Sequence, residues 1–351
     1  MAYGKRGILL LLLVILILVF LISSGYGAMK ISPMQVVSIL LNKAGLPFIT
    51  EFQQSQANVL WSIRLPRVIL GILIGAGLAV SGASLQGLFR NPLADPTLIG
   101  ISSGASLCAV LMIVIVSSSN LLESVTSVTG YYTMNLFTFL GAGVSAVTVY
   151  ILSKNGGKTS VTTMLLSGIA VNALCSALTG LIIFYSTDAE LRNVTFWMLG
   201  SLGGASWNTI LGIFPFILIP VMLIPRLSKS LNAFALGESE ALHLGVPVNQ
   251  LKLRVLVLTT MAVGASVAVA GIIGFVGLII PHLLRLVAGP DNRFVLIASS
   301  LLGAVLLTGS DLISRTIIAP AELPIGIITA ILGTPVFMWI LVKHKPQMRS
   351  F

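Results

Sequence analysis

Residues 65–88 read LPRVILGILIGAGLAVSGASLQGL, an apolar run with one charged residue, Arg67, near its start. A helix needs ~20 mostly apolar residues to cross a bilayer, so this run predicts a transmembrane helix. Nine further runs are bounded by charges or Pro/Gly clusters, at about 7–27, 97–116, 134–153, 161–184, 207–225, 252–274, 277–289, 294–316 and 325–343. The sequence therefore predicts an all-α membrane protein with about ten transmembrane helices, of which the eighth is short for a full span.

The centre of the quoted run occurs a second time. Residues 75–82, GAGLAVSG, match residues 264–271, GASVAVAG, at five of eight positions, and the same offset of 189 residues aligns Pro92 with Pro281. The two helices would cross the membrane in opposite directions, which indicates the inverted repeat found in many transporters. Chance similarity between two Gly/Ala-rich helices is the alternative.

The composition indicates a membrane domain without a soluble part. Hydrophobic residues make up 56% and charged residues 9% of the 351 residues, and the mean hydropathy is +1.04. An ordinary soluble domain has ~25% charged residues. We therefore expect one transmembrane domain, 1–351. Residues 5–28 also resemble a secretory signal, but a retained first helix is expected because the whole chain is hydrophobic.

The predicted topology explains why the chain is basic, with a net charge of +10. With both termini in the cytoplasm, fourteen Lys and Arg residues fall on the cytoplasmic side and six outside. This bias is typical of multi-pass proteins of a cytoplasmic (inner) membrane, surrounded by membrane lipid. It predicts no nucleic-acid partner.

Residue types that carry catalysis or bind metal are scattered. The cysteines lie inside apolar runs and the histidines are isolated, so we expect no metal site, no cofactor and no catalytic residue; they are Cys108, Cys175, His243, His282 and His344. Residues 156–159, GGKT, resemble a phosphate-binding loop, but Leu152 stands where that loop needs its first glycine and no strand precedes it. If ATP drives this protein, another polypeptide must hydrolyse it.

The longest predicted cytoplasmic segment, 226–251, predicts two short surface helices. Gly237 separates them, Glu238 and Glu240 suit the positive end of the second, and Gly245 ends it. They carry small and apolar residues suited to docking into a groove on a partner: Ala235, Leu236, Ala241, Leu242 and Leu244. Resting on lipid headgroups is the alternative, which two acids and a single aromatic residue disfavour.

Two helices carry stripes of small and weakly polar residues. They are Gly168, Asn172, Ser176 and Thr179 or Gly180 in the fifth run, and Gly326, Thr329 and Gly333 in the tenth. Such stripes allow close helix packing or line a path for a bulky ligand. Neither holds paired carboxylates or a histidine cluster, which disfavours proton coupling.

Arginines gather at outer helix ends, against the usual charge bias. Arg64 and Arg67 flank Leu65-Pro66, and Arg315 lies four residues after Asp311, where the two can neutralise each other. These arginines indicate an acidic partner outside, or side chains that extend to the membrane surface.

Several motifs occur in a characteristic order: RLPR at 64–67, QGLFRNPLADP at 86–96, ALGE at 235–238, GFVGLIIPH at 274–282, LPIG at 323–326 and GTPVF at 333–337. With these motifs the chain resembles the FecCD-type permeases of importers for iron-siderophores, haem and cobalamin. The resemblance covers nearly the whole chain, and the ordered set is specific where a single motif would be weak.

The resemblance implies the ABC type II importer permease fold and a homodimer, with a translocation path along its axis lined by the two stripes. Two ATPase subunits would receive the segment Ala235–Gly245, and an extracytoplasmic binding protein would pair its acids with Arg64, Arg67 and Arg315. An inner gate would consist of Asn91, Leu93, Ser160 and Val161. Iron-siderophore is the expected cargo, then haem, then cobalamin. An ion-gradient-driven secondary transporter and a non-transporting membrane scaffold are the alternatives.

Overall fold

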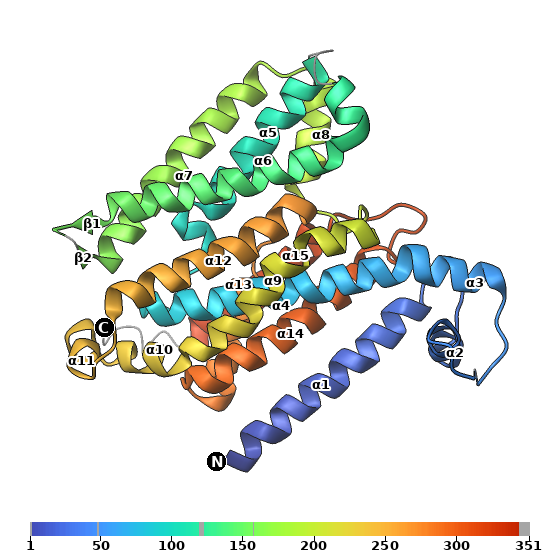
Figure 1. Cartoon of the computed structure of the whole chain (residues 1–351), viewed down its shortest axis with the longest axis horizontal. Coiled ribbons are helices and arrows are strands. Elements are labelled where there is room, and N and C mark those ends of the chain that lie inside the picture. The colour runs from blue at the N-terminus through green and yellow to red at the C-terminus, as the bar shows by residue number, and fades with distance from the viewer. Residues whose placement is uncertain (1, 48, 119–122, 157, 344–351) are drawn as a thin grey trace.

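The computed structural model describes residues 2–343 except 48, 119–122 and 157 and is a bundle of helices (Figure 1). The first half contains α1 (Ala2–Gly25), α2 (Pro33–Lys43), α3 (Gln54–Val59), η1 (Leu60–Arg64), α4 (Leu65–Phe89), η2 (Pro96–Ile99), α5 (Ile101–Ser118), α6 (Glu123–Leu152), β1 (Lys154–Asn155), β2 (Lys158–Thr159) and α7 (Val161–Phe184). The second half contains α8 (Asp188–Met198), α9 (Trp207–Leu223), η3 (Ile224–Leu227), α10 (Ser228–Ala235), α11 (Glu238–His243), α12 (Val248–Ala270), α13 (Val276–Ala288), α14 (Asn292–Ser314) and α15 (Ile325–Lys343).

The predicted helical membrane fold is confirmed. Among the described residues, seven helices are long and apolar enough to cross a membrane, and the shorter apolar helices are Ile101–Ile115, Val276–Ala288 and Ile325–Trp339. Each of the ten predicted runs coincides with one of these helices. The third run is interrupted, however, because Gly100 adopts a left-handed φ of 80° between η2 and α5.

Helix α4 lies at the centre of the bundle, with α9, α12, α13 and α14 packed around it (Figure 1). Two crossings are close enough to require glycine. A Cβ atom on Gly75 would lie 2.3 Å from the carbonyl oxygen of Gly303 in α14, and one on Gly82 would lie 2.0 Å from that of Gly277 in α13. Small residues allow such close helix approach without side chains between the backbones.

The repeated motif lies on helices that run in opposite directions. We call the two ends of the bundle the α2 end and the α11 end, at the right and left of Figure 1. Helix α4 runs from the α2 end to the α11 end, and α12 runs back beside it. Helix α12 stops at Ala270, before the predicted residue 274, because Gly271 has a φ of 72° and residues 271–275 are irregular.

Helices α5, α6, α7 and α8 form a group beside the central bundle, at the top of Figure 1. Helices α5 and α6 join this group to the bundle through contacts with α12. Helix α7 contacts mainly α5, α6 and η2, so much of its surface is exposed, including Leu166 and Leu174.

The two predicted surface helices in 226–251 are present as α10 and α11. Gly237, with a φ of 137°, separates them, and Gly245, with a φ of 78°, follows the end of α11. These positive φ values strain residues with a side chain, so the glycines fix both boundaries.

Candidate functional site

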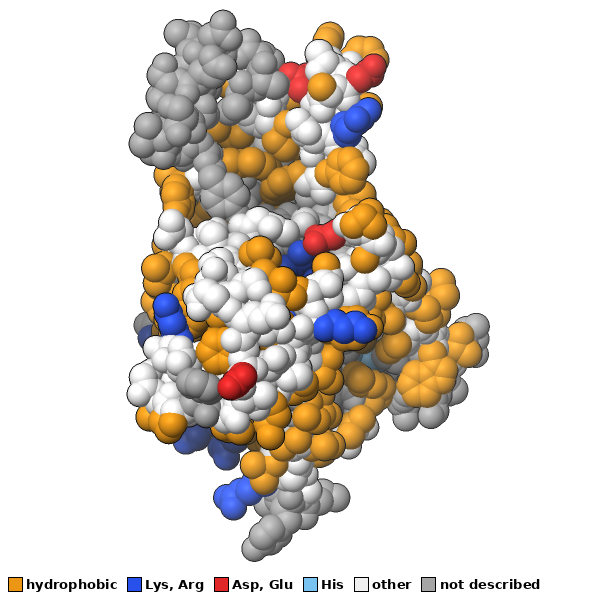
Figure 2. Space-filling view, turned by 90° about the vertical axis from the view of Figure 1, so that its right-hand side faces the viewer, with side chains coloured by type: hydrophobic (Ala, Val, Ile, Leu, Met, Phe, Trp, Pro, Cys, Tyr) orange, Lys and Arg blue, Asp and Glu red, His pale blue; other side chains and the backbone are white. Residues whose placement is uncertain are grey.

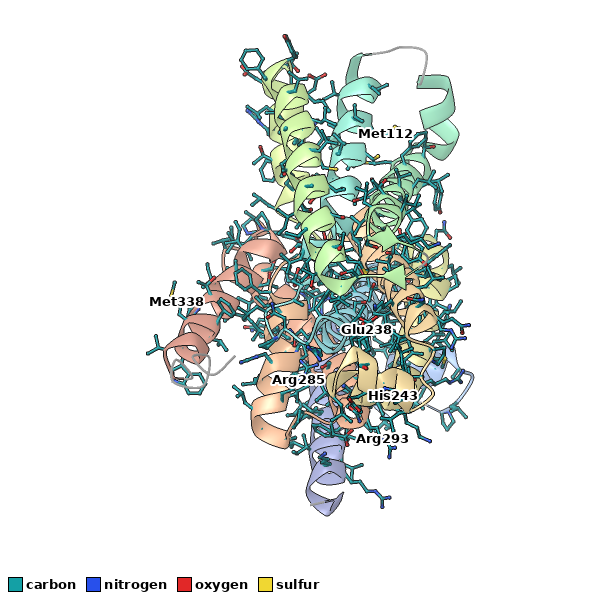
Figure 3. The ribbon with its side chains drawn as sticks, turned by 90° about the vertical axis from the view of Figure 1, so that its left-hand side faces the viewer. Met112, Glu238, His243, Arg285, Arg293 and Met338 are labelled. Atoms are coloured by element: carbon teal, nitrogen blue, oxygen red, sulfur yellow. The ribbon has the colours of Figure 1, made fainter. Side chains whose placement is uncertain are left out.

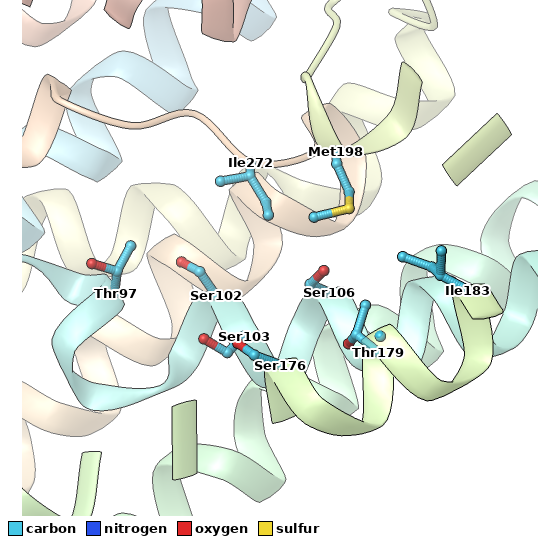
Figure 4. A pocket seen from close by; sticks show the side chains of 10 residues that line it. Thr97, Ser102, Ser103, Ser106, Ser176, Thr179, Ile183, Met198 and Ile272 are labelled. Atoms are coloured by element: carbon cyan, nitrogen blue, oxygen red, sulfur yellow. The ribbon is translucent and has the colours of Figure 1, made fainter. Parts of the chain in front are cut away.

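A cavity of about 350 Å³ lies between α5 and α7 (Figure 4). Three residues of the predicted polar stripe on α7 line it: Ser176, Thr179 and Gly180. Hydroxyls from Ser102, Ser103 and Ser106 of α5 line the opposite wall, and Ile183, Met198 and Ile272 add apolar surface. The cavity therefore combines weakly polar and apolar walls, which suits a ligand that is passed on without tight binding.

Asn172, on the same stripe, connects α7 to the start of α5. Its amide nitrogen donates to the carbonyl oxygen of Thr97 at 2.7 Å, and its amide oxygen accepts a hydrogen bond from Ser103. Asn172 thus positions one cavity wall relative to the other.

The remaining stripe residues pack rather than line this cavity. Added Cβ atoms would clash with the carbonyl oxygen of Leu98 at Gly168, with that of Leu199 at Gly326, and with the side chain of Phe275 at Gly333. Thr329 is 2% exposed. In this conformation the two predicted stripes therefore divide into residues at the cavity, on α7, and residues packed between helices, namely Gly168, Gly326, Thr329 and Gly333.

Arg64 and Arg315 both lie at the α2 end, and their guanidinium groups face inward. Arg64 donates to the carbonyl oxygens of Ser24 at 3.0 Å and Gly25 at 2.6 Å, just where α1 ends. Arg315 donates to the hydroxyl of Ser23 at 2.8 Å and lies 3.7 Å from Asp311. The predicted Asp311–Arg315 pair is confirmed, and both arginines hold the end of α1.

Arg67 is paired with two acids of its own chain. Its Nε donates to Asp311 at 2.9 Å, and its two terminal nitrogens donate to Glu322 at 2.7 and 2.9 Å. The hydrogen bond from Arg67 lowers the pKa of Glu322, against the opposing effect of partial burial. Only Glu322 is substantially exposed in this cluster, with 45% of its side chain accessible.

Figure 2 shows the surface of the α2 end. On the visible described surface, basic and acidic groups are scattered among apolar and uncharged atoms, without a continuous basic patch. In this conformation carbonyl, hydroxyl and carboxylate groups of the chain itself bind these arginines, and docking of an acidic partner to them stays a prediction.

The opposite end of the molecule carries α10 and α11, which face the viewer in Figure 3 around Glu238 and His243. Leu236, Leu242 and Leu244 are 70%, 55% and 63% exposed. Ala241, in contrast, is fully buried and packs α11 onto the protein. Exposed leucines clustered on a short polar segment are typical of a protein-binding surface.

Glu238, the first residue of α11, is bound to a buried lysine. The Nζ of Lys252 in α12 donates to Oε1 of Glu238 at 2.6 Å and to the carbonyl oxygen of Thr159 in β2. The side chain of Lys252 is 0% exposed, and its Nζ lies 5.9 Å from the centre of the Phe234 ring. One buried charge thus connects α11, α12 and the β1–β2 hairpin.

The predicted gate residues lie in two connections of the chain. Asn91 and Leu93 belong to the turn after α4, where Asn91 Oδ1 accepts a hydrogen bond from the Leu93 N–H at 2.9 Å. Ser160 caps α7 by accepting from the Thr163 N–H at 3.3 Å, and Val161 begins that helix. These side chains shape two turns at the α11 end.

The sequence analysis did not single out five residues of these sites. Ser102, Ser103 and Ser106 lie at helical spacing in the third run and could have been recognised as a further polar stripe. Lys252 and Glu322 were missed because their partners, Glu238 and Arg67, are assigned only by the tertiary structure.

Comparison with known proteins gives a consistent result. A family model described as the FecCD transport family matches residues 15–343. The hemin transport system permease protein HmuU of Yersinia pestis is 42% identical over 307 residues, covering 86% of this chain and 90% of the relative. The Fe(3+)-citrate import system permease protein YfmD of Bacillus subtilis is 38% identical, covering 82% of each chain.

A further relative and a solved structure are also similar to this chain. The cobalamin import system permease protein BtuC of Halobacterium salinarum is 39% identical, covering 81% of this chain and 73% of the relative. A solved inward-facing structure, of an ABC transporter assigned to the metal-chelate type, superposes with a TM-score of 0.83 at 32% identity and covers 96% of this chain and 99% of that one.

Proposed function

The chain belongs to the FecCD transport family, and from this premise we propose that it is the permease subunit of an ABC importer that moves an iron chelate across the cytoplasmic membrane. A separate ATPase would hydrolyse the ATP, and this chain would contribute no catalytic residue. The observation that carries the proposal is the family match from residue 15 to 343, which includes the cavity and the α10–α11 segment.

For the cargo we propose iron-siderophore first, then haem, then cobalamin. The relatives are named for hemin, ferric citrate and cobalamin, which are all metal ions held in an organic ligand. The cavity walls, made of hydroxyl and apolar side chains, suit the surface of such complexes. The described residues that line the cavity carry no charge that would select one chelate.

The proposed assembly is a homodimer with two ATPase subunits and an extracytoplasmic binding protein. The exposed surface of α7 supports pairing with a second copy beside the cavity. The exposed leucines of α10 and α11 support an ATPase contact at the α11 end. With that contact, this segment and both termini would lie in the cytoplasm. Nucleotide-driven movement of that segment would then open the path alternately to either side, through the gate residues Asn91, Leu93, Ser160 and Val161.

Docking of the binding protein is proposed at the α2 end. Arg67 is the best placed of the three arginines, because an acidic side chain of a partner can replace the half-exposed Glu322. Replacing Arg67 with Met should weaken docking most at low salt, where attraction between exposed charges is least screened. Equal docking of the Arg67→Met and wild-type proteins at low salt would contradict this role.

The alternative, a secondary transporter, has less support. Asp311, the acid inside α14, is paired with Arg67 and Arg315 and is therefore not a free proton carrier. A functional test separates the two possibilities directly.

The test is uptake into proteoliposomes that contain the permease, its ATPase and its binding protein. We expect ATP-dependent uptake of one member of a panel comprising a ferric siderophore, ferric citrate, haem and cobalamin, and none with a hydrolysis-deficient ATPase. Uptake driven by an ion gradient in the absence of the ATPase would refute the proposal.

A further inference from the structure

Lys252 occupies an unusual position for a lysine. Its side chain is 0% exposed and is the largest fully buried side chain among the described residues. Burying an ammonium group costs several kcal/mol unless the group is paired and hydrogen-bonded. The bonds to Glu238 and to Thr159 therefore make this position tolerable, and they also tie three elements together.

Two hydrogen bonds hold Thr159 of β2 to residues of α12. Asn249, one turn before Lys252 in α12, accepts a hydrogen bond from the Thr159 N–H at 3.3 Å, and Lys252 donates to the Thr159 carbonyl oxygen. The next residue, Ser160, caps α7. A displacement of Thr159 therefore moves the beginning of the helix that carries Ser176 and Thr179 at the cavity.

The other side of the connection is the short helix α11. Glu238 is its first residue, and the exposed leucines Leu242 and Leu244 lie at its end. Because α11 has only six residues, force applied to the leucines reaches Glu238 through little more than one turn.

We propose that Lys252 is a positioning residue that transmits movement of α11 to the start of α7, so that the ATPase contact and the cavity respond together. The inference rests on the proposed function, in which α10 and α11 meet the ATPase. It adds a specific route: from Glu238 through the Lys252 ammonium to the Thr159 backbone, and from there into α7.

The test uses the full reconstituted complex and three variants. Lys252→Met removes the charge at similar length, and Glu238→Gln weakens the same bond from the half-exposed side. Glu51→Gln is the matched control, since Glu51 is an exposed acid between α2 and α3, outside the α10–α11 segment, and forms no ion pair within the described part of the chain. Two quantities are measured: chelate transported per ATP hydrolysed, and the labelling rate of a cysteine introduced by Lys154→Cys in the hairpin, with and without ATP, in a Cys108→Ala, Cys175→Ala background.

We expect Lys252→Met and Glu238→Gln to lower the transport-to-hydrolysis ratio about tenfold, as for loss of a hydrogen bond to a charged group. The nucleotide-dependent change in labelling should disappear in both, while ATPase association is kept. A merely structural role would lower the yield or melting temperature but leave the ratio and the labelling response of the folded fraction unchanged, and that result would overturn the inference.

If Lys252→Met does not fold, Glu238→Gln decides, because it keeps the lysine and a neutral acceptor in place. A Glu238→Gln protein that behaves like Glu51→Gln overturns the inference. A failure of the proposed function gives a different result, because the wild-type complex itself then shows no ATP-dependent uptake. In that case the inference is refuted as well.

Discussion

At the scale of single residues, Arg64 has a structural role that can be measured. Its guanidinium group donates to backbone carbonyl oxygens where α1 ends, inside the protein. Hydrogen bonds to a charged group contribute about 1.5–3 kcal/mol each. Arg64→Met should therefore lower the melting temperature of the detergent-solubilised permease by several degrees, whereas Arg192→Met, at an exposed position of α8, should not. Equal melting temperatures for the two variants would contradict this role.

Glu322 gives the protein a dependence on pH. Its pKa in the folded state is held below the ordinary value of 4.5, mainly by the hydrogen bond from Arg67. The ionised group therefore stabilises the fold above its unfolded-state pKa, and this contribution is lost as the pH falls through the lower folded-state pKa. Melting temperatures measured from pH 7 down to pH 3 should fall less steeply for Glu322→Gln than for the wild type. The variant should also start lower at pH 7, and parallel curves would contradict the prediction.

At the scale of elements, the α4–α14 crossing depends on two facing glycines, Gly75 and Gly303. A Cβ atom on Gly75 would lie 2.3 Å from the Gly303 carbonyl oxygen, so the helices must separate to admit a methyl group. Overpacking of this kind costs ~1–3 kcal/mol. Gly75→Ala should therefore destabilise the bundle, while Gly309→Ala, which meets nothing within 4 Å on α14, should be neutral or stabilising. Thermal unfolding of both variants checks this prediction.

The α10–α11 element offers a test of the ATPase contact. Leu236, Leu242 and Leu244 are exposed on it, and burying leucines at an interface contributes on the order of 1 kcal/mol or more where they are well packed. The triple Leu→Ser variant should lose co-purification with the ATPase while keeping its expression level and melting temperature. Leu46→Ser, exposed near the α2 end, is the control and should keep the complex.

At the scale of the whole molecule, the cavity between α5 and α7 should be part of the transport path. Thr179→Trp places a large ring in a space of about 350 Å³. Chelate uptake should fall at least tenfold while the complex still assembles and hydrolyses ATP. Leu211→Trp, on the exposed surface of α9, controls for the effect of adding a tryptophan. Unchanged uptake in Thr179→Trp would place the path elsewhere.

From the sequence alone, the ten spanning runs and the boundaries of α10 and α11 could be predicted, whereas the breaks at Gly100 and Gly271 could not. Apolar length predicted the spanning runs, and Gly237 and Gly245 marked the ends of α10 and α11, because helix length and backbone conformation depend on neighbouring residues. The motifs also indicated the family that the comparisons then established.

The pairing of charged groups and the packed face of each helix became visible only once the helices were placed in three dimensions. Arg67 with Glu322, and Lys252 with Glu238 and Thr159, join residues from separate elements, and no local pattern specifies such partners. For the same reason the stripe on α7 divided into Gly168, pressed against Leu98, and Ser176, at the cavity. Spacing along a helix gives a residue its face, but the neighbouring element determines whether that face meets backbone, water or lipid.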